Sequence, residues 1–418
     1  MKVSLQPILN DAHIDVMQVT SQRQLQISIS AQPGEIGASV PLNLCLILDH
    51  SGSMTGRPLE MVKKAAKSII DRLKPSDRIS IVAFDHKAKI IVPNQLVGEN
   101  KNTINKQISQ LRADGGTAID EGLKIGIEEL AKGKKDAISQ AFLLTDGENE
   151  HGDNDRCLKF AELAAEYNIT LNSLGFGDHW NQDILEEIAD KGGGTLVYIE
   201  RAEQAVEEFS RLFTRIATVG LTNSYLLLSL IPNVRLAELK PIAQVKPDVI
   251  ELAAQMSEGQ FIVRLGDLMI NTERVILANI YIGKFPEGMQ TIATVQIRYD
   301  DPSIGATGLF SDKIPVEANF LNNYQPVPNA QVQQSILALA KYRQTQLAEA
   351  KLMSGDRAGA ATMLQTAAKT ALQMGDTGAA TVLQTSATQL QAGQDLSEAD
   401  RKKTRIVSKT VLQDKSNS

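Results

Sequence analysis

The sequence contains little cysteine, few aromatic residues and no long hydrophobic run. Cys45 and Cys157 are the only cysteines among 418 residues, and aromatic residues make up 4%. One cysteine lies in an apolar run and the other in an expected helix, so a disulfide framework is not indicated. The chain does not open on a positively charged segment followed by an apolar one, and no apolar run approaches the length of a membrane span. We therefore expect a cytoplasmic protein with reduced cysteines and no membrane span.

An excess of positive charge is also absent. The formal net charge is -6, which argues against nucleic acid as a main partner. The glycine-rich phosphate-binding motif G-x-x-x-x-G-K-[ST] does not occur, so any ATPase activity would have to come from another chain. The length accommodates two or three domains, each with its own core.

From Pro41 to Ala217, short runs of Val, Ile and Leu alternate with amphipathic segments. This pattern is typical of repeated βαβ units and predicts an α/β domain with a doubly wound, mostly parallel sheet. The expected strands are 42–48, 78–84, 89–92, 140–144, 170–176 and 196–199. The expected helices lie near 59–73, 102–111, 118–131, 155–167, 182–189 and 202–216.

Polar residues follow two of these strands and occupy one loop between them. Asp49-His-Ser51-Gly-Ser53 follows the run Leu42 to Leu48, Thr117 lies in Gly-Gly-Thr-Ala, and Asp146 lies in Leu-Leu-Thr-Asp-Gly. The carboxyl ends of parallel strands meet at one edge of a sheet, where such folds bind ligands. Two carboxylates and three hydroxyls suit magnesium, manganese or calcium better than zinc or copper. The alternative is that Asp49 and Ser51 cap the next helix and that Asp146 turns the chain.

These three segments resemble the metal ion-dependent adhesion site of the von Willebrand factor A (VWA) domain, a Rossmann-like fold. The resemblance extends through the segments after Gly175 and Ile184, and so covers the whole α/β region. It implies that Mg²⁺, or alternatively Mn²⁺ or Ca²⁺, binds here and captures a Glu or Asp carboxylate of a protein partner. It also implies the ligand roles: direct ligation by Ser51 and Ser53, ligation by Thr117 in at least one state, and ligation partly through water by Asp49 and Asp146.

Other polar residues lie at the same expected edge. His50 sits inside the motif, but we expect its side chain to point away from the metal. Asp178, His179 and Trp180 follow the fifth strand and are candidate partner contacts, since Trp180 is the only tryptophan. The alternative for Trp180 is that its ring packs under its own loop.

The regions on either side of the α/β domain show the alternation of half-exposed strands. Two N-terminal strands cannot bury themselves, so we expect them to share one antiparallel β-sandwich with the later strands, with the α/β domain inserted between the two pieces. Two independent β modules are the alternative. The expected domain bounds are 1–39 for the N-terminal strands, 40–218 for the VWA domain, 219–325 for the rest of the sandwich, 326–395 for a helical array and 396–418 for a C-terminal helix or tail.

The helical array is expected because Ala, Leu and Gln recur at helical spacing after residue 328. The segments 359–366 and 378–385 nearly repeat, and each follows a Gly-Asp pair that can end one helix and cap the next. The array is either an interaction arm, which includes homo-oligomerisation through these helices, or a lid packed on the sandwich. The cluster Arg401-Lys-Lys-Thr-Arg is expected to be a solvated tail.

Together these features predict a metal-dependent protein-binding module and not an enzyme. The alternative is an accessory subunit of an AAA+ ATPase machine of the chelatase or maturation type. A metal-dependent hydrolase would need a base beside metal-bound water, and no motif supplies one.

Overall fold

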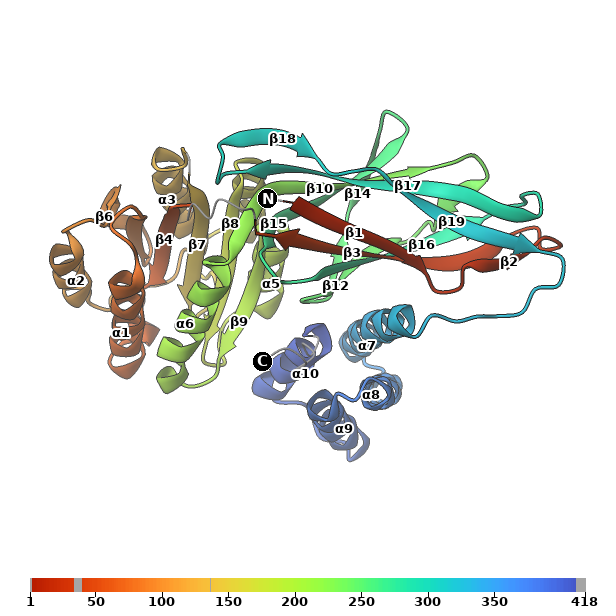
Figure 1. Cartoon of the computed structure of the whole chain (residues 1–418). Helices are drawn as coiled ribbons and strands as arrows, with labels where there is room; N and C mark the ends of the chain where they lie inside the picture. The colour runs from red at the N-terminus through yellow and green to blue at the C-terminus, as the bar shows by residue number, and fades with distance from the viewer. Residues whose placement is uncertain (1, 34–39, 136, 411–418) are drawn as a thin grey trace.

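The structure is a computed structural model that describes residues 2–33, 40–135 and 137–410. It comprises an α/β domain, a β-sandwich and a helical region, with the helices on one side of the other two parts (Figure 1). No helix in these described ranges is both long and apolar enough to cross a membrane.

The α/β domain is built on a six-stranded sheet with the order β6-β5-β4-β7-β8-β9. All neighbouring strands are parallel except the pair β5 and β6. The strands are β4 (Leu42–Asp49), β5 (Arg78–Phe84), β6 (Ala88–Leu96), β7 (Ile138–Thr145), β8 (Ile169–Phe176) and β9 (Gly193–Ile199). Every residue of β4, β7 and β8 is buried, as expected for central parallel strands covered on both faces.

Helices cover both faces of this sheet. The helices on one face are α1 (Arg57–Arg72), α2 (Lys101–Ser109) and α6 (Ala205–Ile216). Those on the other face are α3 (Ile119–Lys132), α4 (Asn154–Glu166) and α5 (Gln182–Lys191). Successive residues of β4 point to opposite faces of the sheet. Leu46 packs against the helices of the first face and Ile47 against those of the second.

The β-sandwich consists of two sheets. The first has the order β1-β3-β16-β12-β13, with β11 paired to β16, and the second has the order β14-β15-β10-β17-β19-β2, with β18 paired to β17. The first sheet contains β1 (Lys2–Leu9), β3 (Ser21–Gln32), β11 (Val234–Leu236), β12 (Ile242–Lys246), β13 (Ile250–Leu252) and β16 (Arg274–Ile282). The second contains β2 (His13–Asp15), β10 (Val219–Leu230), β14 (Ala254–Ser257), β15 (Gln260–Met269), β17 (Gly288–Asp301), β18 (Ala306–Phe310) and β19 (Ile314–Leu321).

The N-terminal strands are integral to this sandwich. Strand β3 pairs with β16 from Ser21 opposite Ile282 to Ile29 opposite Arg274. Side chains from the N-terminal strands and from residues 221–320 fill one core, in which Ile27 and Phe320 are fully buried. The prediction of a shared sandwich with an inserted α/β domain is therefore confirmed.

The helical region contains α7 (Ala330–Met353), α8 (Arg357–Gln373), α9 (Thr377–Gln391) and α10 (Glu398–Lys409). Asp356 and Asp376 cap α8 and α9 by accepting backbone hydrogen bonds, as the Gly-Asp pairs predict. Val332 of α7 packs against Val275 and Leu277 of the sandwich. The helices thus pack onto the rest of the chain, which agrees with the lid interpretation.

Helix α10 lies between the other helices and the α/β domain (Figure 1). Lys402 is 4% exposed, Arg405 forms an ion pair with Glu186 at 2.6 Å, and Lys409 forms one with Asp190 at 2.7 Å. The expectation of a solvated basic tail is wrong for Lys402 and Arg405, because the Lys402 ammonium donates to the Asp178 carbonyl beside Trp180 and Arg405 pairs with Glu186 of α5. Residues 411–418 of the expected tail lie outside the described residues, as do 1 and 34–39 of the expected N-terminal segment, and the five domain bounds stay predictions.

Candidate metal centre

Asp49 is the last residue of β4 and lies at the carboxyl edge of the parallel sheet. Its Oδ1 accepts a hydrogen bond from the Ser51 backbone N–H at 2.8 Å, and its Oδ2 accepts one from the Thr145 hydroxyl at 2.5 Å. The side chain is fully buried, and this burial raises the pKa of Asp49 to about 6 despite the hydrogen bonds. A buried carboxylate in this state gains from a nearby cation.

Ser51, Ser53 and Asp146 continue the cluster. The hydroxyls of Ser51 and Ser53 are 3.0 Å apart, and the Ser53 hydroxyl donates to Asp146 Oδ1 at 2.7 Å. Burial raises the pKa of Asp146, while the hydrogen bond from Ser53 acts in the opposite direction. Residues that are 93 positions apart in the sequence therefore meet at one point.

Thr117 reaches the same point from the loop before α3. The Gly115 carbonyl accepts a hydrogen bond from Gly52 N–H at 3.0 Å, which ties this loop to the segment after β4. Thr117 is 4% exposed. Its Oγ1 lies 3.3 Å from the position that a β-carbon would take at Gly147, so it faces the segment that carries Asp146. All five predicted ligands are thus brought together.

The geometry of this cluster fits a hard divalent cation. Neighbouring oxygens around an octahedral ion with bonds of about 2.1 Å lie about 3.0 Å apart. The two hydroxyl and carboxylate separations of 3.0 and 2.7 Å match that spacing without rearrangement. Neither Asp49 nor Asp146 forms an ion pair with a described side chain. The described residues also contain no group of three or more His, Cys, Asp or Glu side chains arranged to hold a metal, so the set of donors depends on hydroxyls.

The capping alternative has little support from the geometry. Ser51 precedes a short 3-10 turn at Gly52–Met54, but its side chain makes no capping hydrogen bond. Helix α1 begins after Gly56, which has no side chain to cap it. The oxygens of Asp49 and Ser51 instead take part in the cluster.

His50 lies inside the motif, but its ring bonds to other loops. Its Nδ1 lies 2.9 Å from the Arg112 carbonyl, and its Nε2 lies 3.6 Å from Asp85. The ring thus supports the neighbouring backbone and does not join the five oxygens.

The structure separates the three candidate partner contacts. Trp180 is 2% exposed, donates from its indole N–H to the Gly177 carbonyl at 2.7 Å, and packs under its own loop, where the Lys402 ammonium covers it at 4.4 Å. Asp178 accepts a hydrogen bond from the Tyr198 hydroxyl. His179 is the exposed member and lies near Asp146, whose pKa is raised overall by burial. The exposed side chain of His179 is therefore free to contact a partner directly, whereas the ring of Trp180 is covered in this arrangement.

Thr145 is the residue that the sequence interpretation missed. It is fully buried, and its hydroxyl orients the Asp49 carboxylate. Its place directly before Asp146 in the T-D-G segment was the available signal, because residues at parallel strand ends face a shared edge.

Comparison with known proteins identifies the class. Residues 43–212 match the von Willebrand factor type A domain, and residues 330–414 match the Sll0103-like C-terminal alpha-helical domain. The structure of a von Willebrand factor type A protein from Catenulispora acidiphila superposes with a TM-score of 0.83 at 17% identity, over 99% of this chain and 97% of that one. The α/β domain is a VWA domain, and the fold of the whole chain resembles that of the Catenulispora protein.

The family is shown by a full-length relative. Protein sll0103 of Synechocystis is 58% identical over 413 residues, which covers 99% of this chain and 98% of the relative. The chain therefore belongs to the Sll0103-like family of VWA-domain proteins. Protein YfbK of Escherichia coli is 29% identical over 186 residues, and the match covers 43% of this chain and 32% of YfbK.

Proposed function

We propose that this protein is a metal-dependent protein-binding module that captures a carboxylate of a partner at the edge of its VWA sheet. Asp49, Ser51, Ser53, Thr117 and Asp146 would hold a divalent cation, with Mg²⁺ as the first candidate. The continuous hydrogen-bonded cluster from Thr145 through Asp49 and Ser51 to Ser53 and Asp146 carries this proposal. When bound, the cation would supply a coordination position for a Glu or Asp oxygen of the partner.

The protein side chains prepare the site in two ways. The Thr145 hydroxyl and the Ser51 N–H fix both oxygens of Asp49, so that the buried carboxylate does not reorient. The hydroxyls of Ser51, Ser53 and Thr117 offer oxygen without charge, so two carboxylates alone supply negative charge from this cluster. Because the cluster carries so little negative charge, a divalent ion bound there would still attract a third carboxylate.

We further propose binding and not catalysis as the activity. Both carboxylates of the cluster accept hydrogen bonds from serine or threonine, which supports a positioning role for them. The accessory role beside an AAA+ ATPase, the homo-oligomer formed through the helices and the cytoplasmic location stay predictions, and no contact among the described residues favours one of them.

Isothermal titration calorimetry of the full chain with MgCl₂ and MnCl₂ tests the metal site. Wild type should bind about one ion, whereas Asp146→Asn should weaken binding by roughly a hundredfold or more, because it removes one of two ligand charges. Glu150→Gln is the matched control, since Glu150 is an exposed acid in the same loop. Equal weakening in both variants, or in neither, would contradict the assignment.

A further inference from the structure

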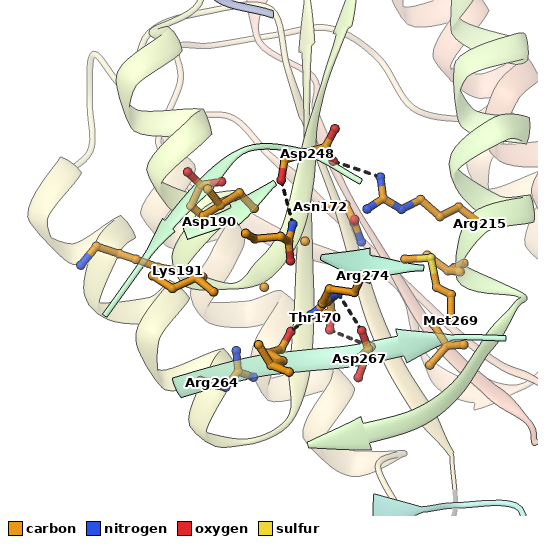
Figure 2. Close-up of a pocket in the computed structure, with 18 of the residues that line it drawn as sticks. Thr170, Asn172, Asp190, Lys191, Arg215, Asp248, Arg264, Asp267, Met269 and Arg274 are labelled. Carbon is orange, nitrogen blue, oxygen red and sulfur yellow. Dashed lines mark hydrogen bonds and ion pairs between the residues drawn. The ribbon is translucent and has the colours of Figure 1, made fainter. Parts of the chain in front are cut away.

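A cavity lies at the amino edge of the VWA sheet, opposite the carboxyl edge that carries the candidate metal centre. Its volume is about 260 Å³, and it lies between the amino ends of β7 to β9 and the sandwich strands β10, β12, β13, β15 and β16 (Figure 2). The polar side chains that reach it come from both domains and include three arginines: Arg215, Arg264 and Arg274. The cavity is therefore formed only when the two domains are packed together.

The three guanidinium groups are held in place without strong carboxylate partners. Arg264 donates from Nη2 to the Ala165 carbonyl at 2.9 Å, and its Nε is buried without a hydrogen-bond partner. Arg274 donates to the backbone carbonyls of Asp267, at 2.9 Å, and Leu265. Arg215 has a single contact with Asp248 at 3.4 Å. Pairs of guanidinium groups with carboxylates or phosphates frequently form two parallel hydrogen bonds, and none of these three arginines forms such a pair with a described residue.

The charges that line the cavity leave an excess of positive groups. Asp190 pairs with Lys409 at 2.7 Å, and Glu251 pairs with Arg343 at 3.0 Å, so both carboxylates are neutralised from outside the cavity. Asp248 is matched by Arg215.

Asp267 is then the remaining acid near Arg264 and Arg274, and this single carboxylate interacts electrostatically with both arginines without a direct ion pair. Its Oδ2 accepts neutral hydrogen bonds from Gln140 at 2.7 Å and Thr170 at 2.8 Å. Arg264 and Arg274 form no ion pair with a described carboxylate. Burial is the main reason why the pKa of Arg274 falls to about 10, and the nearby Arg215 adds to this effect.

The backbone of β9 leaves space for one of these groups. Gly193 has φ of 71°, and a β-carbon there would lie 3.1 Å from Arg264 Nη1. A larger residue would be strained and would crowd the guanidinium. The apolar part of the wall comprises Ile216, Val219, Leu265 and Met269.

We propose that this cavity binds a small organic anion, with its carboxylate or phosphate group held by Arg264 and Arg274 and its short apolar part against the Ile216 and Met269 wall. The Nη1 of Arg264 faces Gly193 and forms no hydrogen bond with a described residue, so an anion in the cavity would gain a charge-assisted hydrogen bond there. The volume lies below the range of about 300–1,000 Å³ that is typical of drug-sized ligands, which restricts the ligand to a small metabolite.

Calorimetry and thermal unfolding of the full chain, in buffer with chelator and constant ionic strength, test this site with two probes: inorganic phosphate and succinate. At least one probe should bind saturably and raise Tm. Arg264→Gln should weaken that binding by roughly tenfold or more, because it removes charge-assisted hydrogen bonds. Asp267→Asn should strengthen it, since the neutral amide no longer repels an anion. The probe that binds identifies whether carboxylate or phosphate is preferred.

Arg235→Gln is the matched control. Arg235 belongs to the same sandwich but is exposed and stacks over Tyr281 outside the cavity. Asp267→Asn keeps the test decisive if Arg264→Gln destabilises the fold, because a gain in affinity does not arise from misfolding. Absence of saturable binding by either probe, or equal effects of Arg264→Gln and Arg235→Gln, would overturn the proposal and leave the cavity as a structural junction.

Discussion

The two edges of the VWA sheet present polar clusters of different origin. At the carboxyl edge, Asp49 and Asp146 come from segments that directly follow buried strands of one domain. At the amino edge, Gln140 and Thr170 of that domain meet Arg264 and Asp267 of the sandwich. A site made by strand ends is visible in the sequence as a motif, whereas a site made by docking two domains has no local signature.

The largest expected effect is the complete loss of anion binding, with metal binding retained, in a fragment that contains the VWA domain alone. A fragment of residues 40–218 should bind Mg²⁺ within about threefold of the full chain, since all five ligands lie within it and additive behaviour is expected for distant groups. The same fragment should show no anion binding, because Arg264 and Arg274 are missing. Calorimetry with MgCl₂ and then with the anion probe measures both. Anion binding retained by a folded fragment would break the comparison.

Helix α10 contacts the α/β domain near both edges of its sheet. Loss of one ion pair between α10 and this domain should have the next largest effect, which is on the free energy of unfolding. Arg405 is 14% exposed and pairs with Glu186, which is 4% exposed. Arg405→Ala leaves the buried Glu186 with Lys409 as its remaining cationic partner and also removes the pairs of Arg405 with Asp183 and Glu349. The change should lower the free energy of unfolding by about 2–4 kcal/mol. Arg401→Ala is the control, because Arg401 is an exposed residue of the same helix. Chemical denaturation followed by circular dichroism measures the difference, and equal destabilisation would show that the ion pair is not important.

Thr117→Ala distinguishes ligands within the carboxyl edge. Water can replace one neutral hydroxyl, so Mg²⁺ affinity should fall by less than about tenfold, in contrast to the loss of a ligand charge in Asp146→Asn. Metal-dependent retention of a partner on immobilised protein should fall more than the metal affinity does. If Thr117→Ala instead abolished metal binding, the hydroxyl would be a principal ligand and the division of roles would be wrong.

The smallest effect concerns the pH dependence at the amino edge. Burial raises the pKa of Asp267 in the folded protein, even though Thr170, Arg264, Gln140 and Arg274 act in the opposite direction. A raised carboxyl pKa contributes stability at low pH that is lost as pH rises through the folded-state value. Asp267→Asn should therefore flatten the acid-side pH dependence of Tm relative to wild type. An unchanged profile would show that Asp267 titrates normally.

The sequence predicts the α/β domain well because its signals are local. The apolar run Leu42 to Leu48 is bounded by a polar motif, and the observed strand Leu42–Asp49 agrees with it within one residue. The fold class is confirmed, including the shared sandwich. The register could not be predicted, because alternation in Ser21–Gln32 shows which face is buried but not that Ile29 lies opposite Arg274.

Burial of charged residues is the main feature that the sequence could not reveal. A basic cluster normally stays solvated, and only the folded arrangement places Lys402 against Trp180 and Arg405 against Glu186. The position of Asp267 beside Thr170 likewise depends on how two domains pack, over a separation of 97 residues. Such contacts depend on tertiary geometry, and no spacing rule in one sequence encodes them.

The cover that α10 places over Trp180 makes this chain suited to optical measurement. Trp180 is the only tryptophan, so its emission reports a single environment. The indole is buried, with Tyr198 at 5.7 Å and the Lys402 ammonium at 4.4 Å from the ring. Displacement of α10 would admit water to the ring and shift its emission to longer wavelength. The native protein thus carries an intrinsic fluorophore at the contact between its C-terminal helix and the loop that bears His179, so any displacement of this helix would be measurable without a label.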